Sequence, residues 1–346
     1  MTYFRKWLGL VMGVLATLFV AFTVNQQVVH AEKVTYSVAP IYPENQTDKN
    51  LGYYDLRVKP GQKQDVSVVV QNTGKKDLEV DVAPNTAITN QNGVIDYSQS
   101  DPQYDKTLKY PFTKLMSPAQ RLKVPAESSR TATFTLNAPK ENFKGTILGG
   151  FYVSQVKQDQ VEQALDHKKG TSLTNRYSYI LGVKLTQSDQ TVKPHLRLNR
   201  IKPGLLNGHT GILANIQNTQ ANSVGEMQVD AKIRRVGQSK VLYQSKQTDL
   251  QMAPNSNFDY GIDLKNQPLK AGHYNIKIKV NSNKGQWLLS KDFEITQKEA
   301  RQYNGKAVEL PQNNWWLYVI IGIMVLLILF LLFLLWRKNK QDKTEE

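Results

Sequence analysis

Apolar and polar residues alternate in short runs through most of the region 53–295, and Gly, Pro, Asn or Asp separates the runs. Alternation with a period of two indicates antiparallel β-strands that bury one face. The predicted strands of the first half are 53–58, 65–71, 77–83, 131–136, 145–156 and 177–186. Those of the second half are 195–200, 211–217, 226–234, 240–244, 258–264, 273–280 and 287–295. The polar segment 157–170 is compatible with a helix or with a solvated loop.

The two halves share their turn signals in the same order. The triplet Gln-Asn-Thr occurs at 71–73 and again at 217–219, each time between two predicted strands, and turns that contain Pro125 and Pro254 follow. Asn tolerates left-handed backbone, and Asn and Thr side chains bond to nearby backbone, so we interpret the triplet as a repeated turn and not as a ligand site. About seven short strands in each half predict an all-β fold of two tandem immunoglobulin-like β-sandwiches.

The two ends of the chain carry apolar segments of different kinds. Residues 1–31 combine a charged start, an apolar run at 8–22 and a small residue, Ala31, as in a cleaved secretory signal peptide; an uncleaved anchor is the alternative. Residues 315–336 contain no charge and would span roughly 33 Å as a helix, enough to cross a bilayer core of about 30 Å. Flanking Trp residues and a basic tail predict a single-pass membrane helix with a cytoplasmic C-terminus.

The predicted organisation places both sandwiches outside the cell, at the cell wall. The segment 310–314 resembles a sortase sorting signal, but Asn313 and Asn314 stand where that signal has Thr and Gly. We therefore expect the chain to keep its membrane anchor. The predicted segments are a signal peptide at 1–31, sandwiches at 32–189 and 190–305, a juxtamembrane linker at 306–314, a transmembrane helix at 315–336 and a cytoplasmic tail at 337–346.

Residues that usually carry catalysis or bind metals are scarce. The sequence has no Cys and five His, and no two His have the spacing of metal ligands. Motifs for a nucleophilic serine, a zinc protease or a phosphate-binding loop are absent. Glycan hydrolysis needs two carboxylates across a cleft, and Asp96, Asp101 and Asp105 could be proposed, but isolated Asp residues are common in polar loops. We predict a protein that is not an enzyme and has no cofactor and no metal site.

A long connection, 84–118, joins two predicted strands of the first sandwich. Long ordered loops in compact domains tend to be functional, and amides, carboxylates and aromatic rings suit sugars. One interpretation is a surface for a glycan or a protein partner. The other is an insertion that packs its own aromatic side chains over the sandwich. The candidate ligand-binding residues are Asn90, Asn92, Asp96, Tyr97, Tyr104 and Tyr110.

Positive charge is concentrated in the second half of the chain. Residues 32–189 hold 20 Lys and Arg against 17 Asp and Glu, a net of +3, whereas residues 190–310 hold 18 against 9, a net of +9. Outside the membrane, such a field favours anionic wall polymers, anionic host glycans or acidic proteins, and not nucleic acid. General solubility is the alternative explanation.

Several segments resemble one known family. SVAPIYPENQ (37–46), GYYDLRVKPGQ (52–62), NTAITNQNGVIDYS (85–98), FKGTILGGFYV (143–153) and RYSYILGVKL (176–185) are similar to the peptidoglycan-binding domain of WxL-interacting proteins. ANIQNTQA (214–221), MAPNSNFDY (252–260) and LKAGHYNIKIKV (269–280) are similar to the host-binding domain that follows it in that family. The resemblance covers essentially the whole mature chain.

The resemblance implies a surface scaffold of Gram-positive bacteria. Its partners would be peptidoglycan, secreted WxL-domain surface proteins and host extracellular matrix proteins, the last through the second domain. The alternative is a primary adhesin for host matrix proteins or anionic glycans, without a role at the wall. The chain has its own Trp-x-Leu, 287–289, which we interpret as part of a strand core and not as the motif of the partner proteins.

Overall fold

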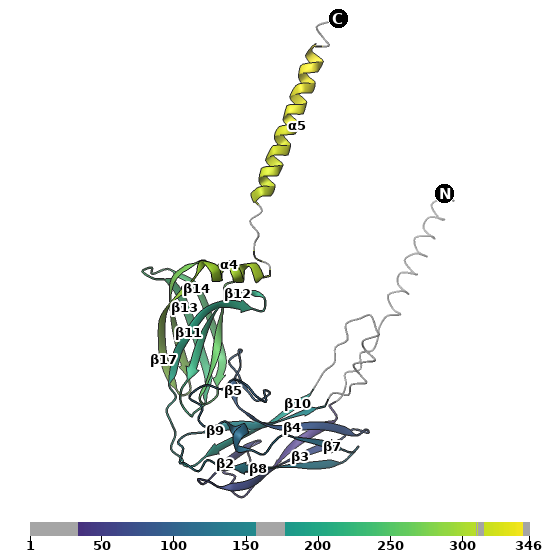
Figure 1. Ribbon diagram of the computed structural model, residues 1–346, viewed down its shortest axis with the longest axis vertical. Coiled ribbons are helices and arrows are strands. Elements are labelled where there is room, and N and C mark those ends of the chain that lie inside the picture. The colour runs from purple at the N-terminus through teal and green to yellow at the C-terminus, as the bar shows by residue number, and fades with distance from the viewer. Residues whose placement is uncertain (1–33, 157–176, 309, 311–314, 342–346) are drawn as a thin grey trace, which may run out of the picture.

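The computed structural model describes residues 34–156, 177–308, 310 and 315–341, and these form two β-sandwiches followed by helices (Figure 1). The N-terminal sandwich contains β1 (Tyr36–Ile41), β2 (Tyr54–Arg57), β3 (Lys63–Asn72), β4 (Leu78–Thr86), β7 (Gln120–Val124), β8 (Ser129–Asn137), β9 (Ile147–Gln155) and β10 (Ser178–Thr186). The C-terminal sandwich contains β11 (Leu196–Leu206), β12 (His209–Asn218), β13 (Val224–Arg235), β14 (Val241–Met252), β15 (Ser256–Asp263), β16 (Gly272–Ser282) and β17 (Gly285–Ile295). The predicted fold class of two tandem sandwiches is confirmed. The predicted signal peptide and the segment 157–170 lie outside the described residues.

The two sandwiches repeat one strand order. The sheets of the first are β1-β3-β8 and β2-β10-β9-β4-β7, and those of the second are β11-β12-β15 and β14-β13-β16-β17. Without β2, the two orders are the same, because the remaining strands correspond one to one along the chain. β2 joins the edge of its sheet by pairing in parallel with β10. The five-stranded sheet of the first sandwich therefore has an edge that the second sandwich lacks.

Both Gln-Asn-Thr triplets end a strand and hold the same turn. Asn72 and Asn218 are buried, with exposed fractions of 1% and 0%. Each side-chain amide donates to backbone carbonyls of its own turn and of the turn that faces it. These acceptors are Lys76, Val124 and Pro125 in the first copy, at 2.8–3.1 Å, and Asn222 and Ala253 in the second, at 2.7 and 3.2 Å. The interpretation of the triplet as a repeated structural turn is confirmed.

Edge strands account for most of the strand residues that the pattern did not predict. The predictions missed β1 and β7 and ended too early in β11 and β14, and all four strands lie at the edge of a sheet. β1 contains Pro40 and β11 contains Pro203, a residue that disrupts a central strand but is tolerated at an edge. β14 continues through the polar run 245–249, which has no apolar alternation. Pairing with a neighbouring strand, and not burial of alternate residues, defines these segments.

The core of the N-terminal sandwich is built around Phe151 of β9. The ring of Phe134 lies 4.9 Å from that of Phe151, centroid to centroid, and all atoms of both side chains are buried. The loop 84–118 contributes a short helix, α2 (Phe112–Leu115), whose Phe112 is also fully buried against Phe151. Phe112 occupies the space beside Gly149, where a side chain is missing. Phe112 therefore packs against the sandwich, as the interpretation of this loop as a packed insertion predicts.

A ten-residue helix after β17 was not predicted. α4 (Gln297–Lys306) follows a capping box in which the Thr296 hydroxyl accepts from the Glu299 N–H at 3.2 Å and the Glu299 carboxylate accepts from the Thr296 N–H at 2.9 Å. Such a box satisfies two backbone donors at the start of a helix. The helix buries only Ala300. Its sequence therefore lacks the apolar stripe by which helices are recognised, and the capping box is the signal that was available.

Replacing Thr296 with Ala should destabilise α4 without unfolding the sandwich. The lost cap is expected to cost about 1 kcal/mol. Hydrogen exchange of the α4 amides should become faster, while the amides of β16 should keep their protection. The neighbouring exposed Lys298 provides the control, because its change to Ala leaves the cap intact; equal exchange in both variants would contradict the role of the cap.

The last described element is α5 (Trp315–Gln341), which contains the apolar window Leu317–Leu334. This window is long and apolar enough to cross a membrane.

The interpretation of the Trp-x-Leu in β17 is correct in part. Trp287 and Leu289 pack against the core, but Leu288 is 75% exposed because alternate residues of a strand point to opposite faces.

Candidate functional site

Three of the predicted site residues lie on a small hairpin formed by β5 (Ile88–Thr89) and β6 (Ile95–Asp96). The Asn90 side-chain oxygen accepts from the N–H groups of Asn92 and Val94, at 3.0 and 3.2 Å, and so closes the hairpin turn. Asn92 is exposed at the tip. The Asp96 carboxylate accepts from the Ser98 N–H at 2.8 Å. Asn90 and Asp96 thus have local structural partners, and their contact with a ligand stays a prediction.

The three predicted tyrosines are half-buried at different places. The Tyr97 ring lies over Gly150 of β9, and burial raises the pKa of Tyr97 to about 12. The Tyr110 hydroxyl donates to the Glu141 carboxylate at 2.9 Å, and its ring packs against the core. Tyr104 lies in the loop just before Asp105. The six predicted residues therefore do not form one cluster.

The loop that carries these residues joins the two sandwiches. We call its contacts with the C-terminal sandwich the clasp; they are made by Thr89, Gly93, Asp105 and Thr107. Figure 1 shows β5 between the sandwiches. The Thr89 hydroxyl lies 2.6 Å from that of Ser256 and accepts from the Ala253 N–H at 3.0 Å. Thr89 and Ser256 are each 5% exposed, so this contact is dry. The Gln251 N–H donates to the Gly93 carbonyl at 2.6 Å.

Asp105 is the charged member of the clasp. Its carboxylate accepts from the Gln217 amide at 2.9 and 3.0 Å and from the Asn257 amide at 2.5 Å, and it also accepts from the N–H and hydroxyl of Thr107. Gln217 is the first residue of the second Gln-Asn-Thr triplet. Burial acts to raise the pKa of Asp105, but the hydrogen bonds from Thr107, Gln217 and Asn257 outweigh it and hold the pKa below its usual range.

Acid should loosen the clasp. Because the folded chain lowers the pKa of Asp105 below 3.8, the ionised carboxylate stabilises the clasp fully above that pH, and this contribution is lost as the pH falls through the folded-state pKa. The chain has no Cys, so a spin label attached to one introduced Cys in each sandwich can report the distance between them. We expect a broader distance distribution at pH 3 than at pH 7.

Asp105→Asn should give the broader distribution already at pH 7. Asp101→Asn, in the same loop and exposed, is the matched control and should behave as the unchanged chain does. A distribution that is the same for Asp105→Asn and the control would contradict the role of this carboxylate.

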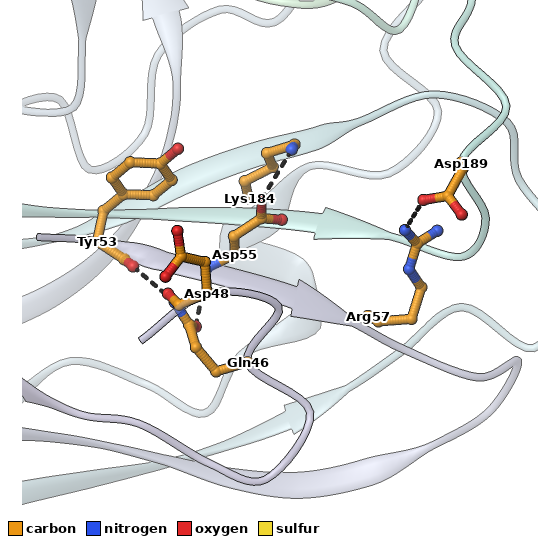
Figure 2. Close-up of polar contacts among 7 residues, drawn as sticks. All are labelled: Gln46, Asp48, Tyr53, Asp55, Arg57, Lys184 and Asp189. Atoms are coloured by element: carbon orange, nitrogen blue, oxygen red, sulfur yellow. Dashed lines mark hydrogen bonds and ion pairs between the residues drawn. The ribbon is translucent and has the colours of Figure 1, made fainter. Parts of the chain in front are cut away.

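A charged pocket of about 500 Å³ lies where the sandwiches meet, beside β2 and β10. Its wall includes Asp55, Arg57, Lys184, Asp189 and Lys284. The Lys184 ammonium lies 2.9 Å from Asp55 Oδ2, and Arg57 pairs with Asp189 (Figure 2). A pocket of this size is within the range of small-ligand sites, roughly 300–1,000 Å³. Cations and carboxylates side by side suit a ligand that carries both an anionic group and hydrogen-bond donors.

Gln46 fixes the position of Asp55, one of the residues that line this pocket. Its side-chain oxygen accepts from the Asp55 N–H at 3.0 Å, and its amide donates to the carbonyls of Asp48 and Tyr53 at 2.8 and 3.1 Å (Figure 2). Gln46 is 8% exposed, and Asp55 is 9% exposed. The start of β2 is therefore fixed by side-chain hydrogen bonds as well as by pairing with β10.

Sequence reasoning missed both the clasp partners and the pocket. Asp105-x-Thr107 carries the signal of a local side-chain turn, but nothing in its sequence points to Gln217. Asp55 and Lys184 are 129 positions apart and meet because β2 pairs with β10. Asp105 was one of the three carboxylates considered for glycan hydrolysis and set aside, and the structure places it in the contact between the sandwiches.

Comparisons with known proteins give the family. A model described as the WxL Interacting Protein, peptidoglycan binding domain, matches residues 36–155, and one described as the WxL Interacting Protein, host binding domain, matches residues 168–305. No curated protein matches the chain. Both matched descriptions are of binding domains.

Solved structures with a similar arrangement include fimbrial chaperones. The class 5 fimbriae chaperone CfaA is 16% identical, with 74% of this chain and 98% of that chain covered and a TM-score of 0.29. The CsuC-CsuE chaperone-tip adhesion subunit complex of Acinetobacter baumannii is 14% identical, with 74% and 97% covered and a TM-score of 0.29. Similarity at this level carries over no chaperone role.

The two matched domains follow each other in the order that the sequence motifs predicted, and together they cover both sandwiches. The chain belongs to the WxL-interacting protein family and has its peptidoglycan-binding domain followed by its host-binding domain.

Proposed function

We propose that this protein is a non-enzymatic scaffold anchored in the cell membrane. It binds peptidoglycan and secreted WxL proteins at the wall, and its second domain contacts host matrix components. The observation that carries this proposal is the clasp, because a buried, hydrogen-bonded contact joins the peptidoglycan-binding domain to the host-binding domain. Such a contact lets a load on one domain pass to the other, as a scaffold between wall and partner requires.

The membrane arrangement is part of the same proposal. The apolar window of α5 supports a single span. Four basic residues follow the predicted span, at 337, 338, 340 and 343, and basic flanks stay on the cytoplasmic side. The sandwiches would then lie outside the membrane, where peptidoglycan is found.

Sedimentation with purified peptidoglycan tests the proposal. The full chain, in detergent, is mixed with peptidoglycan and, separately, with secreted WxL proteins from the same bacterium. We expect the chain to sediment with the peptidoglycan, to retain the WxL proteins on an affinity resin and to release no soluble sugar from the wall. Failure to bind peptidoglycan, or failure to bind the WxL proteins, would refute the scaffold function. Release of wall fragments would refute the proposal that the protein is not an enzyme.

A primary adhesin is the second candidate, and the net charge of +9 in residues 190–310 favours it. Binding of this kind should weaken steeply with salt, since exposed charges are screened over about 8 Å at physiological ionic strength. The full chain is therefore tested on matrix proteins and on an anionic glycan at low and high salt. Salt-sensitive binding to these ligands without any binding to peptidoglycan would favour the adhesin.

A further inference from the structure

Two tyrosines flank a flat strip on the outer face of the five-stranded sheet. Gly150 and Gly182 are directly paired across β9 and β10. Tyr97 lies over Gly150, and Tyr53 lies beside Gly182, where an added Cβ would be 3.6 Å from the Tyr53 Cβ. Gly150 is buried under the Tyr97 ring, so the partly exposed Gly182 is the open part of this strip. Tyr53 is 38% exposed, so its ring is available to a ligand.

The charged pocket continues this strip along the strands. Tyr53 and Asp55 lie two residues apart on one face of the sheet, and Gly182 and Lys184 do so on the neighbouring strand. Two residues of a strand span about 7 Å, so the charged side chains of Asp55 and Lys184 start about 7 Å from Tyr53 and Gly182. Figure 2 shows Tyr53, Asp55 and Lys184 on adjacent strands, with Arg57 and Asp189 beyond them. An apolar floor with rings thus adjoins a pocket with paired charges.

Asp55 has an unused hydrogen-bond acceptor. The residue is 9% exposed, and its Oδ2 binds Lys184, but its Oδ1 is buried and has no hydrogen-bond partner among the described residues. Buried polar atoms in native proteins nearly always have a partner. A hydroxyl, an amide N–H or an ammonium group of a ligand, directly or through a water molecule, would satisfy this oxygen.

We infer that the strip and the pocket form one site, and that this site is where the N-terminal domain binds peptidoglycan. It is defined by Tyr53, Asp55, Arg57, Gly182 and Lys184. The inference rests on the proposed function. The ligand is an N-acetylated amino-sugar glycan that carries a carboxylate: a sugar ring lies on the glycine floor against Tyr53, a carboxylate binds Arg57 and Lys184, and a donor of the ligand reaches Asp55. The carboxylate belongs either to the sugar acid or to the attached peptide.

Two variants test the two halves of the site in the full chain. Tyr53→Ala removes the ring, and Arg57→Gln removes a cation that is paired with an exposed carboxylate and not with the buried Asp55. The probe is a soluble peptidoglycan fragment, a disaccharide of N-acetylated sugars that bears a dipeptide. We expect each variant to bind it at least about tenfold more weakly than the unchanged chain, by calorimetric titration.

The matched controls are Ile41→Ala and Lys123→Gln. Ile41 is an exposed apolar residue on the other sheet, and Lys123 is an exposed cation at the far edge of the same sheet. Both should leave binding unchanged. Gly182→Ala adds a methyl group to the floor where there is room for it, and it should weaken binding with little effect on the unfolding temperature.

Two further probes locate the carboxylate: the free dipeptide, and the disaccharide without its peptide, in which the sugar acid has a free carboxylate because no amide bond uses it. If Arg57→Gln weakens binding of the dipeptide, the carboxylate belongs to the peptide; if it weakens binding of the peptide-free disaccharide alone, the carboxylate belongs to the sugar acid. Unchanged affinity of Tyr53→Ala for the fragment, or unchanged affinity of Arg57→Gln for all three probes, would overturn this site. If the unchanged chain fails to sediment with whole peptidoglycan, the proposed function fails, and the site fails with it.

Discussion

Asn72→Ala is expected to lower the free energy of unfolding of the N-terminal sandwich by about 3–4 kcal/mol, because it leaves several buried backbone groups without a partner. The Asn72 amide donates to three carbonyls, of Lys76, Val124 and Pro125, and its oxygen accepts from the Gly74 N–H. Alanine can make none of these bonds, and at a residue that is 1% exposed the freed backbone groups stay buried.

The repeat supplies an independent test of the same cause. Asn218→Ala should destabilise the C-terminal sandwich by a comparable amount, since Asn218 holds the equivalent turn and is fully buried. Hydrogen exchange of the full chain during urea unfolding would separate the two effects, with β3 and β8 reporting the first sandwich and β12 and β15 the second. Gln71→Ala, one residue away and exposed, should change stability by less than about 0.5 kcal/mol. A small effect at either Asn would refute the role assigned to the triplet.

Gly149→Ala is expected to destabilise the N-terminal sandwich by about 3 kcal/mol through overpacking. A Cβ at this position would lie 2.1 Å from Cδ1 and 2.2 Å from Cγ of Phe112. Phe112 is fully buried and cannot turn away into solvent. Either the ring must leave the core or β9 must move away from α2, and both changes remove buried contacts.

Gly182→Ala is the matched control for this prediction. Gly182 lies in the neighbouring strand of the same sheet, but a Cβ there meets only the Tyr53 Cβ at 3.6 Å, an ordinary contact. Urea unfolding should therefore show a much smaller change for Gly182→Ala than for Gly149→Ala. Similar midpoints for the two variants would mean that backbone flexibility, and not the clash with Phe112, decides the result.

The loop 84–118 shows how far sequence could predict the site. Its length and its aromatic residues predicted either a ligand surface or an insertion that packs over the sandwich, and the burial of Phe112 supports the second. While Phe112 packs into its own sandwich, other residues of the loop contact β12, β14 and β15 of the other sandwich, through Thr89, Gly93 and Asp105. These contacts join residues more than 110 positions apart, and no local pattern records such a separation. Of the six predicted site residues, Tyr97 lies beside the glycine pair of the site inferred above.

The buried strands, the repeat and the apolar ends could all be identified from the amino-acid sequence. Central strands bury every second residue, so their alternation is written into the chain, as in Val66, Val68 and Val70 of β3. The equivalent turns at Asn72 and Asn218 could be read because a turn is made by neighbouring residues. The family motifs indicated the same division into two binding domains.

The edge strands, the clasp and the charged pocket depend instead on tertiary packing. Edge strands such as β1 and β14 are held by pairing on one side, so they tolerate Pro and polar runs that hide them from a search for alternation. The pair of Asp55 and Lys184 exists because β2 joins β10 in parallel, and Asp105 meets Gln217 because the two sandwiches are folded against each other. Each of these sites joins distant residues, and their position depends on how sheets and domains pack.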